Sequence, residues 1–186
     1  CLFTDTDSYA VQFNLPESEV DARLKEHADW MDFGAMPPGH PLRDPTNHGK
    51  LGYLKDEGSD QKHKGKPVYH AMRSFWGAAC KMYTYTYDIR SYREDGTYEV
   101  VGKDVKSTGK GIPKKAVLTG ESPEVTLSQA IRDAARGKFH VSASFQSLLS
   151  KRLRISSKSL TRVMQPIESK RWVAADLVST LPFGYN

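Results

Sequence analysis

The sequence has little cysteine and no long apolar run, and both absences exclude classes of protein. Its two cysteines, Cys1 and Cys80, are too few for a disulfide framework and lack the spacing of a metal cluster. No apolar run approaches the ~20 residues that a membrane-spanning helix needs, and the N-terminus has no signal-peptide pattern. We therefore expect a soluble, intracellular protein in a reducing compartment, with no membrane partner.

An initiator methionine is also absent, and the most informative motif follows within a few residues of Cys1. Because most of the strand that would lead into this motif is then missing, we interpret the sequence as a fragment of a longer chain. Its 186 residues are enough to bury a core and predict one domain with an appended lobe. Contents of 38% hydrophobic and 26% charged residues are ordinary for a globular protein.

Charge is distributed unevenly along the chain. Residues 1–60 contain 5 Lys/Arg and 12 Asp/Glu, a net charge of −7, whereas residues 61–186 contain 22 and 10, a net charge of +12. The first segment suits cations and the second suits polyanions such as nucleic acids, although many solvated protein faces are basic as well.

The most informative motif is the turn Asp5-Thr6-Asp7-Ser8. Two aspartates two residues apart place carboxylate oxygens where a hard divalent cation such as Mg²⁺ can be held together with substrate phosphates. This arrangement suits phosphoryl transfer. The alternatives are a turn-capping role for Asp5 and a loop that binds a calcium-type cation.

Periodicity and turn residues predict the elements around this motif. Alternation from Tyr9 to Phe13 predicts a hairpin with the paired aspartates at its tip. A helix is expected to begin at Pro16, to bury Val20, Leu24, Ala28 and Met31, and to end near residues 32–34. The four prolines of residues 35–49 predict an irregular loop, followed by a short strand over 50–57 and a polar turn over 58–66.

The rest of the chain reads as strands around one helix. Aromatic and β-branched residues predict strands over 67–76, 81–89 and 97–105, the last two joined by a turn at Glu94-Asp95-Gly96. A helix capped by Thr126 or Ser128 is expected to stop at Gly137, and extended segments follow over 139–149 and 153–163. The tail after residue 169 has too many helix breakers to be helical.

Two groups of residues are candidates for nucleic-acid contacts. Tyr83, Tyr85 and Tyr87 share one face of a predicted strand, which suits base stacking but equally describes a half-buried sheet face. Lys110, Lys114 and Lys115 lie beside Gly109 and Gly111, so that backbone and ammonium groups could both approach a phosphate. This segment lacks the Gly-Lys-Ser/Thr ending of a Walker loop, and a solvated basic loop is the alternative.

Taken in order, the motifs resemble the C-terminal part of family B DNA polymerases, in particular the protein-primed and related viral or mobile-element branch. Asp5-Thr6-Asp7-Ser8 is similar to the family's third palm motif, Tyr-x-Asp-Thr-Asp-Ser, with Phe3 in place of the tyrosine. The segment from Lys50 to Glu57 resembles the Leu-Gly-aromatic segment, ending in glutamate, of this branch.

The later motifs follow in the same order as in the family. Lys81-Met82-Tyr83 fits its Lys-x-Tyr motif at the border of palm and thumb, and Lys110-Gly111-Ile112 fits the lysine-glycine step that comes next. The segment from Ser169 to Tyr185 is similar to the closing segment of the viral members. The resemblance thus covers nearly the whole chain.

The resemblance implies roles for individual residues. A primer 3′ hydroxyl would attack the α-phosphate of a deoxynucleoside triphosphate at two Mg²⁺ ions, with Asp7 as the main metal ligand, Asp5 beside it, and Thr6 and Ser8 in support. Glu57 would help to order this site or would merely pair with Lys55. Primer-template DNA would be contacted by Lys81, Tyr83, Lys110, Lys114 and Lys115.

The implied architecture is α+β, with an antiparallel palm sheet, the aspartate hairpin and a covering helix in residues 1–105 and a small mixed α/β thumb in residues 106–186. In the protein-primed members a priming terminal protein is a further partner, and replication takes place within a host cell. The family's first two palm motifs are absent from this sequence, so we expect the isolated chain to be inactive. A non-catalytic DNA-binding remnant and a cation-binding structural module are the alternative functions.

The six histidines have no metal-like spacing among themselves or with Cys80, and we interpret them as structural or surface residues.

Overall fold

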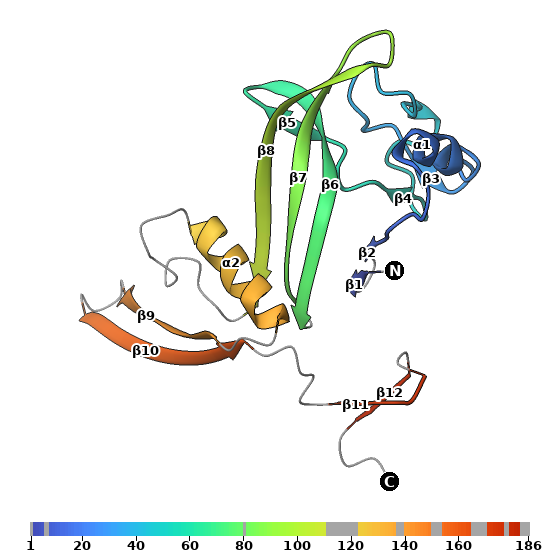
Figure 1. Cartoon of the computed structure of the whole chain (residues 1–186). Helices are drawn as coiled ribbons and strands as arrows, with labels where there is room; N and C mark the ends of the chain where they lie inside the picture. The colour runs from blue at the N-terminus through green and yellow to red at the C-terminus, as the bar shows by residue number, and fades with distance from the viewer. Residues whose placement is uncertain are drawn as a thin grey trace. The chain divides into compact units, whose positions relative to one another are not determined.

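A computed structural model describes residues 2–5, 8–79, 81–110, 123–136, 140–149, 154–164, 171–176 and 179–182. These residues form a mixed α+β fold with a curled antiparallel sheet and two α-helices (Figure 1). The predicted α+β class is therefore confirmed, whereas the division into palm and thumb stays a prediction. The chain forms two compact units: unit 1 is Cys1–Ser74 with Thr86–Asp104, and unit 2 is Phe75–Tyr85 with Val105–Asn186.

The largest sheet has four strands in the order β5-β6-β7-β8. The strands predicted over 67–76, 81–89 and 97–105 are confirmed, and each continues past its predicted end, although residues 77–79 of the first are Gly-Ala-Ala and carry no strand-favouring side chain. The short strand β5 was expected to be a polar turn, since its residues show no apolar alternation. The bounds are β5 Gln61–His63, β6 Lys66–Ala79, β7 Met82–Tyr92 and β8 Tyr98–Gly109.

Unit 1 begins with the predicted hairpin of β1 (Phe3–Asp5) and β2 (Ser8–Ala10). The second strand ends at Ala10, earlier than the alternation to Phe13 predicted. The rest of this part contains α1 Glu17–Lys25, β3 Met31–Asp32, a 3₁₀ turn at Pro45–Asn47 and β4 Leu54–Lys55, with β3 and β4 paired in parallel. Residues 35–49 otherwise form the expected irregular loop.

Helix α1 is shorter than predicted, because the chain continues from Lys25 in tight turns. His27 N–H donates to Leu24 O at 3.1 Å, and Ala28 N–H donates to Lys25 O at 3.2 Å. Such turns still place every third or fourth residue on one side, so Leu24, Ala28 and Met31 reach the cluster of Phe33, Met36 and Leu42 as a helix would have done. The apolar period was therefore correct for these three residues, whereas Val20 is only half-buried and is not part of this cluster, and the inferred helix end was wrong.

Glu17 links helix α1 to the large sheet. Its carboxylate accepts from Arg73 Nη1 at 2.7 Å and from Arg90 Nη2, and Arg73 Nε also donates to Asp88 at 2.6 Å. Arg90 is 6% exposed, and its guanidinium lies 4.2 Å from the ring centroid of Tyr98. A buried guanidinium needs such compensation, because removing its partner leaves an unpaired charge away from water. We call Glu17, Arg73, Asp88 and Arg90 the Glu17 clamp.

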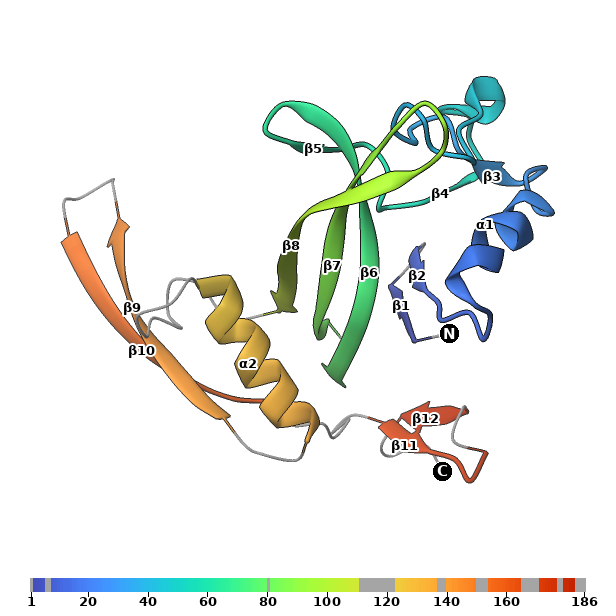
Figure 2. The same cartoon turned by 45° about the horizontal axis from the view of Figure 1, so that its top comes forward.

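In unit 2, helix α2 (Pro123–Ala135) packs on one face of the sheet (Figure 2). Leu127 and Ile131 are fully buried and belong to a cluster with Ala78 of β6. Beside them the buried hydroxyl of Thr84 joins the helix to the sheet. Its Oγ1 donates to Ser128 Oγ of α2 at 2.8 Å and lies 3.0 Å from Ser107 Oγ of β8. The helix begins at Pro123, before Thr126 and Ser128. The prediction that one of these two residues caps its N-terminus is therefore wrong.

The two extended segments predicted after α2 form one hairpin, and the tail, which was expected only to be non-helical, contains a second hairpin that was not predicted. Strand β9 pairs with β10 and β11 pairs with β12, both antiparallel. Their bounds are β9 His140–Leu149, β10 Arg154–Met164, β11 Arg171–Val173 and β12 Thr180–Pro182. Gly137 lies outside the described residues. Neither of the two described α-helices is long and apolar enough to cross a membrane.

The Glu17 clamp predicts that Glu17→Gln lowers the free energy of unfolding by about 1–3 kcal/mol, because the Arg90 charge stays buried while its carboxylate partner is neutralised. The exposed Glu19 on the same helix provides the control, Glu19→Gln, which we expect to change stability by less than about 0.5 kcal/mol. Urea unfolding followed by circular dichroism measures both. Equal effects of the two substitutions would contradict a specific role for the clamp.

Candidate functional site

The sequence-predicted site residues fall into two groups, one in each unit. In unit 1, Asp5 and Ser8 are register partners across the β1–β2 hairpin, so Thr6 and Asp7 connect the two strands. The predicted hairpin is thus confirmed. Thr6, Asp7 and the side chain of Asp5 lie outside the described residues, and metal binding by the two aspartates stays a prediction.

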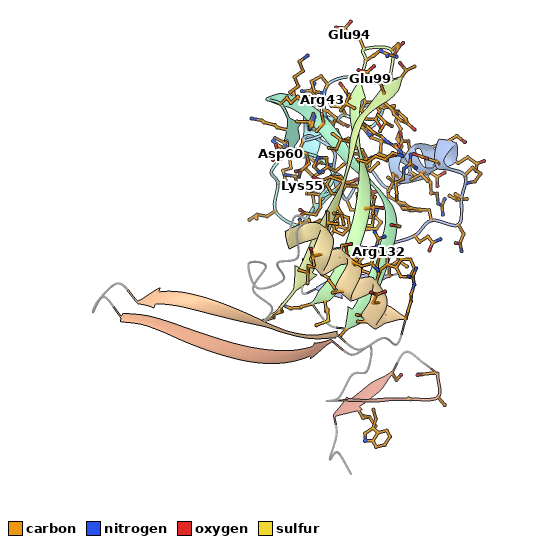
Figure 3. All side chains as sticks on the ribbon, turned by 60° about the vertical axis from the view of Figure 1, so that its left-hand side comes forward. Arg43, Lys55, Asp60, Glu94, Glu99 and Arg132 are labelled. Atoms are coloured by element: carbon orange, nitrogen blue, oxygen red, sulfur yellow. The ribbon has the colours of Figure 1, made fainter. Side chains whose placement is uncertain are left out.

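Glu57, the other predicted acidic residue, is exposed, and its backbone carbonyl accepts from Gln61 Nε2 at 3.2 Å. The alternative of a pair with Lys55 is wrong, because Lys55 Nζ binds Asp60 Oδ2 at 3.2 Å (Figure 3). The left-handed backbone of Asp60, with φ 56°, turns the chain into β5 next to that pair. Within the described ranges, no three His, Cys, Asp or Glu residues gather as a metal site would require.

In unit 2 the structure brings together two lysines that are far apart in the sequence. Lys81 lies in the turn between β6 and β7 with a left-handed φ of 56°, and its carbonyl accepts from the N–H of Lys110 at 3.0 Å. Lys110 follows directly on the end of β8 and is exposed. The two predicted DNA-contacting lysines therefore share one end of the sheet. Lys114 and Lys115 lie outside the described residues.

Next to these lysines, three aromatic rings form a ladder on one face of the sheet. The rings of Phe75 and Tyr83 are stacked with centroids 5.6 Å apart and an interplanar angle of 21°, and those of Tyr83 and Tyr85 are 6.4 Å apart at 10°. All three side chains are half-buried. Because successive side chains of a strand alternate, Thr84 points to the opposite face, where α2 packs. We call Phe75, Tyr83 and Tyr85 the aromatic ladder.

A lysine that the sequence analysis missed completes this surface. Lys106 of β8 is exposed, and its Nζ lies 6.0 Å from the centroid of the Tyr85 ring. Its neighbour Ser107 is buried with Thr84, so Lys106 points to the face of the tyrosines. A predicted strand that continued past residue 105 would have placed Lys106 there by alternation alone. Tyr87, the third tyrosine of the predicted face, belongs to unit 1 and stacks on His70 at 4.4 Å.

This arrangement can bind a nucleic-acid strand by its two general features. Exposed ammonium groups neutralise phosphates, and aromatic faces or tyrosine hydroxyls contact sugars and bases without reading sequence. The exposed Lys106 and Lys110 and the half-buried Lys81 carry the charge, and the aromatic ladder carries the rings.

A second group of polar residues in unit 1 surrounds the buried side chain of His40. The His40 ring lies 5.2 Å from the ring of Tyr69 and 4.4 Å from that of Tyr92, and its Nδ1 accepts from Leu42 N–H at 3.1 Å. Tyr69 Oη donates to Asp56 Oδ2 at 2.8 Å, while Asp56 Oδ1 accepts from Gly58 N–H at 2.7 Å. These contacts agree with the structural role inferred for His40, and they assign Asp56 a role that the sequence did not indicate.

Burial lowers the pKa of His40 to about 4, against a weaker attraction from Asp56. Burial also raises the pKa of Tyr69, and Asp56 acts in the same direction. Perturbed pKa values of this kind mark some active sites. Here, however, His40, Tyr69 and Asp56 already form hydrogen bonds with groups of the protein itself. The cluster is therefore best understood as packing that joins the loop of residues 33–60 to the sheet.

His40 predicts a pH dependence of stability. The unfolded chain binds a proton near the ordinary histidine pKa of 6.5 and the folded chain only near 4, so this residue's contribution is complete above pH 6.5 and falls as the pH decreases from there to 4. A shift of this size corresponds to about 3 kcal/mol at pH 4. His40→Asn keeps an acceptor for Leu42 N–H but does not titrate, so its free energy of unfolding should fall less between pH 7 and pH 5 than that of the parent. Urea unfolding at pH 7 and pH 5 measures both proteins. If the free energy of unfolding fell equally in the parent and in the variant, His40 would not be the cause of the pH dependence.

Comparisons of the whole chain with models of known protein families, with curated proteins and with solved structures find no match.

Proposed function

We propose that the chain is the part of a DNA-directed DNA polymerase that carries the third palm motif and a surface for primer-template DNA. One observation carries the proposal: the backbone hydrogen bond between Lys110 and Lys81 joins two segments that the sequence had separately predicted to contact DNA. The neighbouring aromatic ladder and Lys106 add a stacking face and a further cation to the same unit.

The acidic hairpin fits the metal that this function implies. Pairing of Asp5 with Ser8 confines the motif to one hairpin tip, and carboxylate oxygens are the ligands that Mg²⁺ prefers. When bound, two Mg²⁺ ions would stabilise the attacking and leaving oxygens of nucleotide transfer. Asp7 would be the main protein ligand, with Asp5 as the second carboxylate and Thr6 and Ser8 as supporting residues. Glu57 has no assigned role in this proposal.

The DNA surface would act through charge and position. Lys81, Lys106 and Lys110 would bind phosphates of the primer-template duplex, and the Tyr83 hydroxyl and ring would contact the sugar and base beside them. The buried hydroxyls of Thr84, Ser107 and Ser128 hold the sheet against α2 from the other face, which fixes the strand from which Tyr83 and Tyr85 project.

The DNA surface predicts that Lys81→Asn with Lys110→Gln weakens binding of the chain to primer-template DNA. Asparagine tolerates the left-handed backbone of residue 81, so charge is removed with little strain. We expect about a tenfold loss of affinity near 0.1 M salt and a decrease of about two in the slope of log K against log salt. Fluorescence anisotropy over a salt series measures both.

The matched control is Lys25→Gln with Lys50→Gln, which removes two exposed charges from unit 1. We expect its affinity to stay within about twofold of the parent. If the control weakened binding as much as the Lys81 and Lys110 substitutions, binding would follow net charge alone and the proposed surface would be wrong.

The acidic hairpin predicts that Asp5→Asn with Asp7→Asn abolishes binding of Mn²⁺, used as a spectroscopic probe for Mg²⁺ sites. The exposed carboxylates Glu19 and Asp29 provide the control, Glu19→Gln with Asp29→Asn. Electron paramagnetic resonance of free Mn²⁺ counts the bound ions. Unchanged binding by the Asp5 and Asp7 variant would contradict the metal site, while metal binding combined with no affinity for DNA would favour a cation-binding structural module.

A further inference from the structure

We propose that the hairpin of β5 and β6 in unit 1 is a second nucleic-acid contact, which inserts its tip into a groove of duplex DNA. The hairpin has the sequence Lys62-His63-Lys64-Gly65-Lys66, and its three lysines are exposed. The inference goes beyond the proposed function, which assigns no role to these residues, and shares with it only the duplex partner.

The distribution of charge around the hairpin supports insertion into a groove. His63 pairs with Lys66 across the two strands, and Lys62 pairs with Pro67. Because side chains alternate along a strand, Lys62 and Lys66 lie on opposite faces of the ribbon, with Lys64 at the tip between them. A ribbon that is basic on both faces matches a site with phosphates on two walls, and the major groove of DNA is wide enough for a two-stranded β-ribbon.

The ammonium groups of the three lysines have no acidic partner among the described residues. In the parts of the chain that the structure describes, none of Lys62, Lys64 and Lys66 forms an ion pair, whereas Lys55 nearby binds Asp60 at 3.2 Å. The chain before the hairpin is strongly acidic, with 12 Asp/Glu against 5 Lys/Arg in residues 1–60. The hairpin tip is therefore a local basic feature that directly follows an acidic segment.

The turn itself places a lysine where the backbone favours another residue. Lys64 has φ 50° and Gly65 has φ 80°, so both central residues of this two-residue turn are left-handed. Asparagine or aspartate is strongly preferred before glycine in such turns, and other residues with a side chain pay a steric cost of about 1 kcal/mol. Apart from its two chain neighbours, no atom of the described residues lies within 4 Å of the position that a Cβ of Gly65 would occupy, so this side of the tip has space for a ligand.

The surface chemistry favours a nucleic acid over a membrane. Val68 at the base of the hairpin is buried, and no large apolar side chain between residues 61 and 71 is exposed. A peripheral membrane contact usually combines basic residues with apolar groups that enter the lipid. Cations on two opposite faces also suit a groove better than a flat anionic surface.

The first test compares two double variants of the whole chain. Lys62→Gln with Lys66→Gln removes the charges of both faces, and Lys25→Gln with Lys50→Gln is the control of equal charge. In fluorescence anisotropy with a 20-base-pair duplex near 0.1 M salt, we expect about a tenfold loss of affinity for the first variant and less than twofold for the control. Equal losses in the two variants would overturn the proposal.

The same experiment separates the groove from other anionic partners. The proposal requires the loss to be larger for the duplex than for a single strand of the same length. If the Lys62 and Lys66 substitutions instead weakened binding to phosphatidylserine vesicles and left duplex binding unchanged, the hairpin would be a membrane contact and the proposal would be wrong. A duplex loss in this variant, with none in the variant of Lys81 and Lys110, would support the hairpin and contradict the proposed function.

Lys64→Asn provides a variant in which folding and binding should change in opposite directions. Asparagine suits the left-handed position, so the midpoint of thermal unfolding should stay the same or rise, while loss of the tip charge should weaken duplex binding about two- to eightfold. A variant that bound the duplex as tightly as the parent would overturn the role of the tip. A lower unfolding midpoint together with weaker binding would assign Lys64 a structural role and also count against it.

Discussion

The buried charge of Arg90 is the constraint on which the arrangement of unit 1 depends. A guanidinium that is 6% exposed is costly unless an anion compensates it, and Glu17 from the first turn of α1 supplies that anion. Since α1 has no fully buried residue of its own, its position on the sheet depends on this pairing and on the apolar residues that follow the helix. Residues 11–16 connect the β1–β2 hairpin to this helix.

Unit 2 uses the two faces of its sheet for different purposes. One face is closed by α2 through Leu127, Ile131 and a buried group of three hydroxyls, each of which has a partner in the group. The other face carries the aromatic ladder and Lys106. Because the face covered by α2 fixes the strands, the rings on the other face are held at a constant spacing.

The sequence was most informative where a local pattern determines the structure. Aromatic and β-branched residues predicted β6, β7 and β8, and alternation next to the paired aspartates predicted the β1–β2 hairpin. Local patterns failed for β5, whose polar residues depend on pairing with Val68 and its neighbours, and for the end of α1, where tight turns keep the helical period. The contact of Lys81 with Lys110, the Glu17 clamp and the position of Lys106 all join distant segments, and no single stretch of sequence contains that information.

The division of the chain into units has a consequence for its modularity. Strands β6 and β7 each belong to both units, since unit 2 takes residues 75–85 from the middle of unit 1. A piece beginning at residue 105 would therefore lack Ala78 and Thr84, against which α2 packs. A single cut in the gene between the two units would therefore separate α2 from residues of its own core.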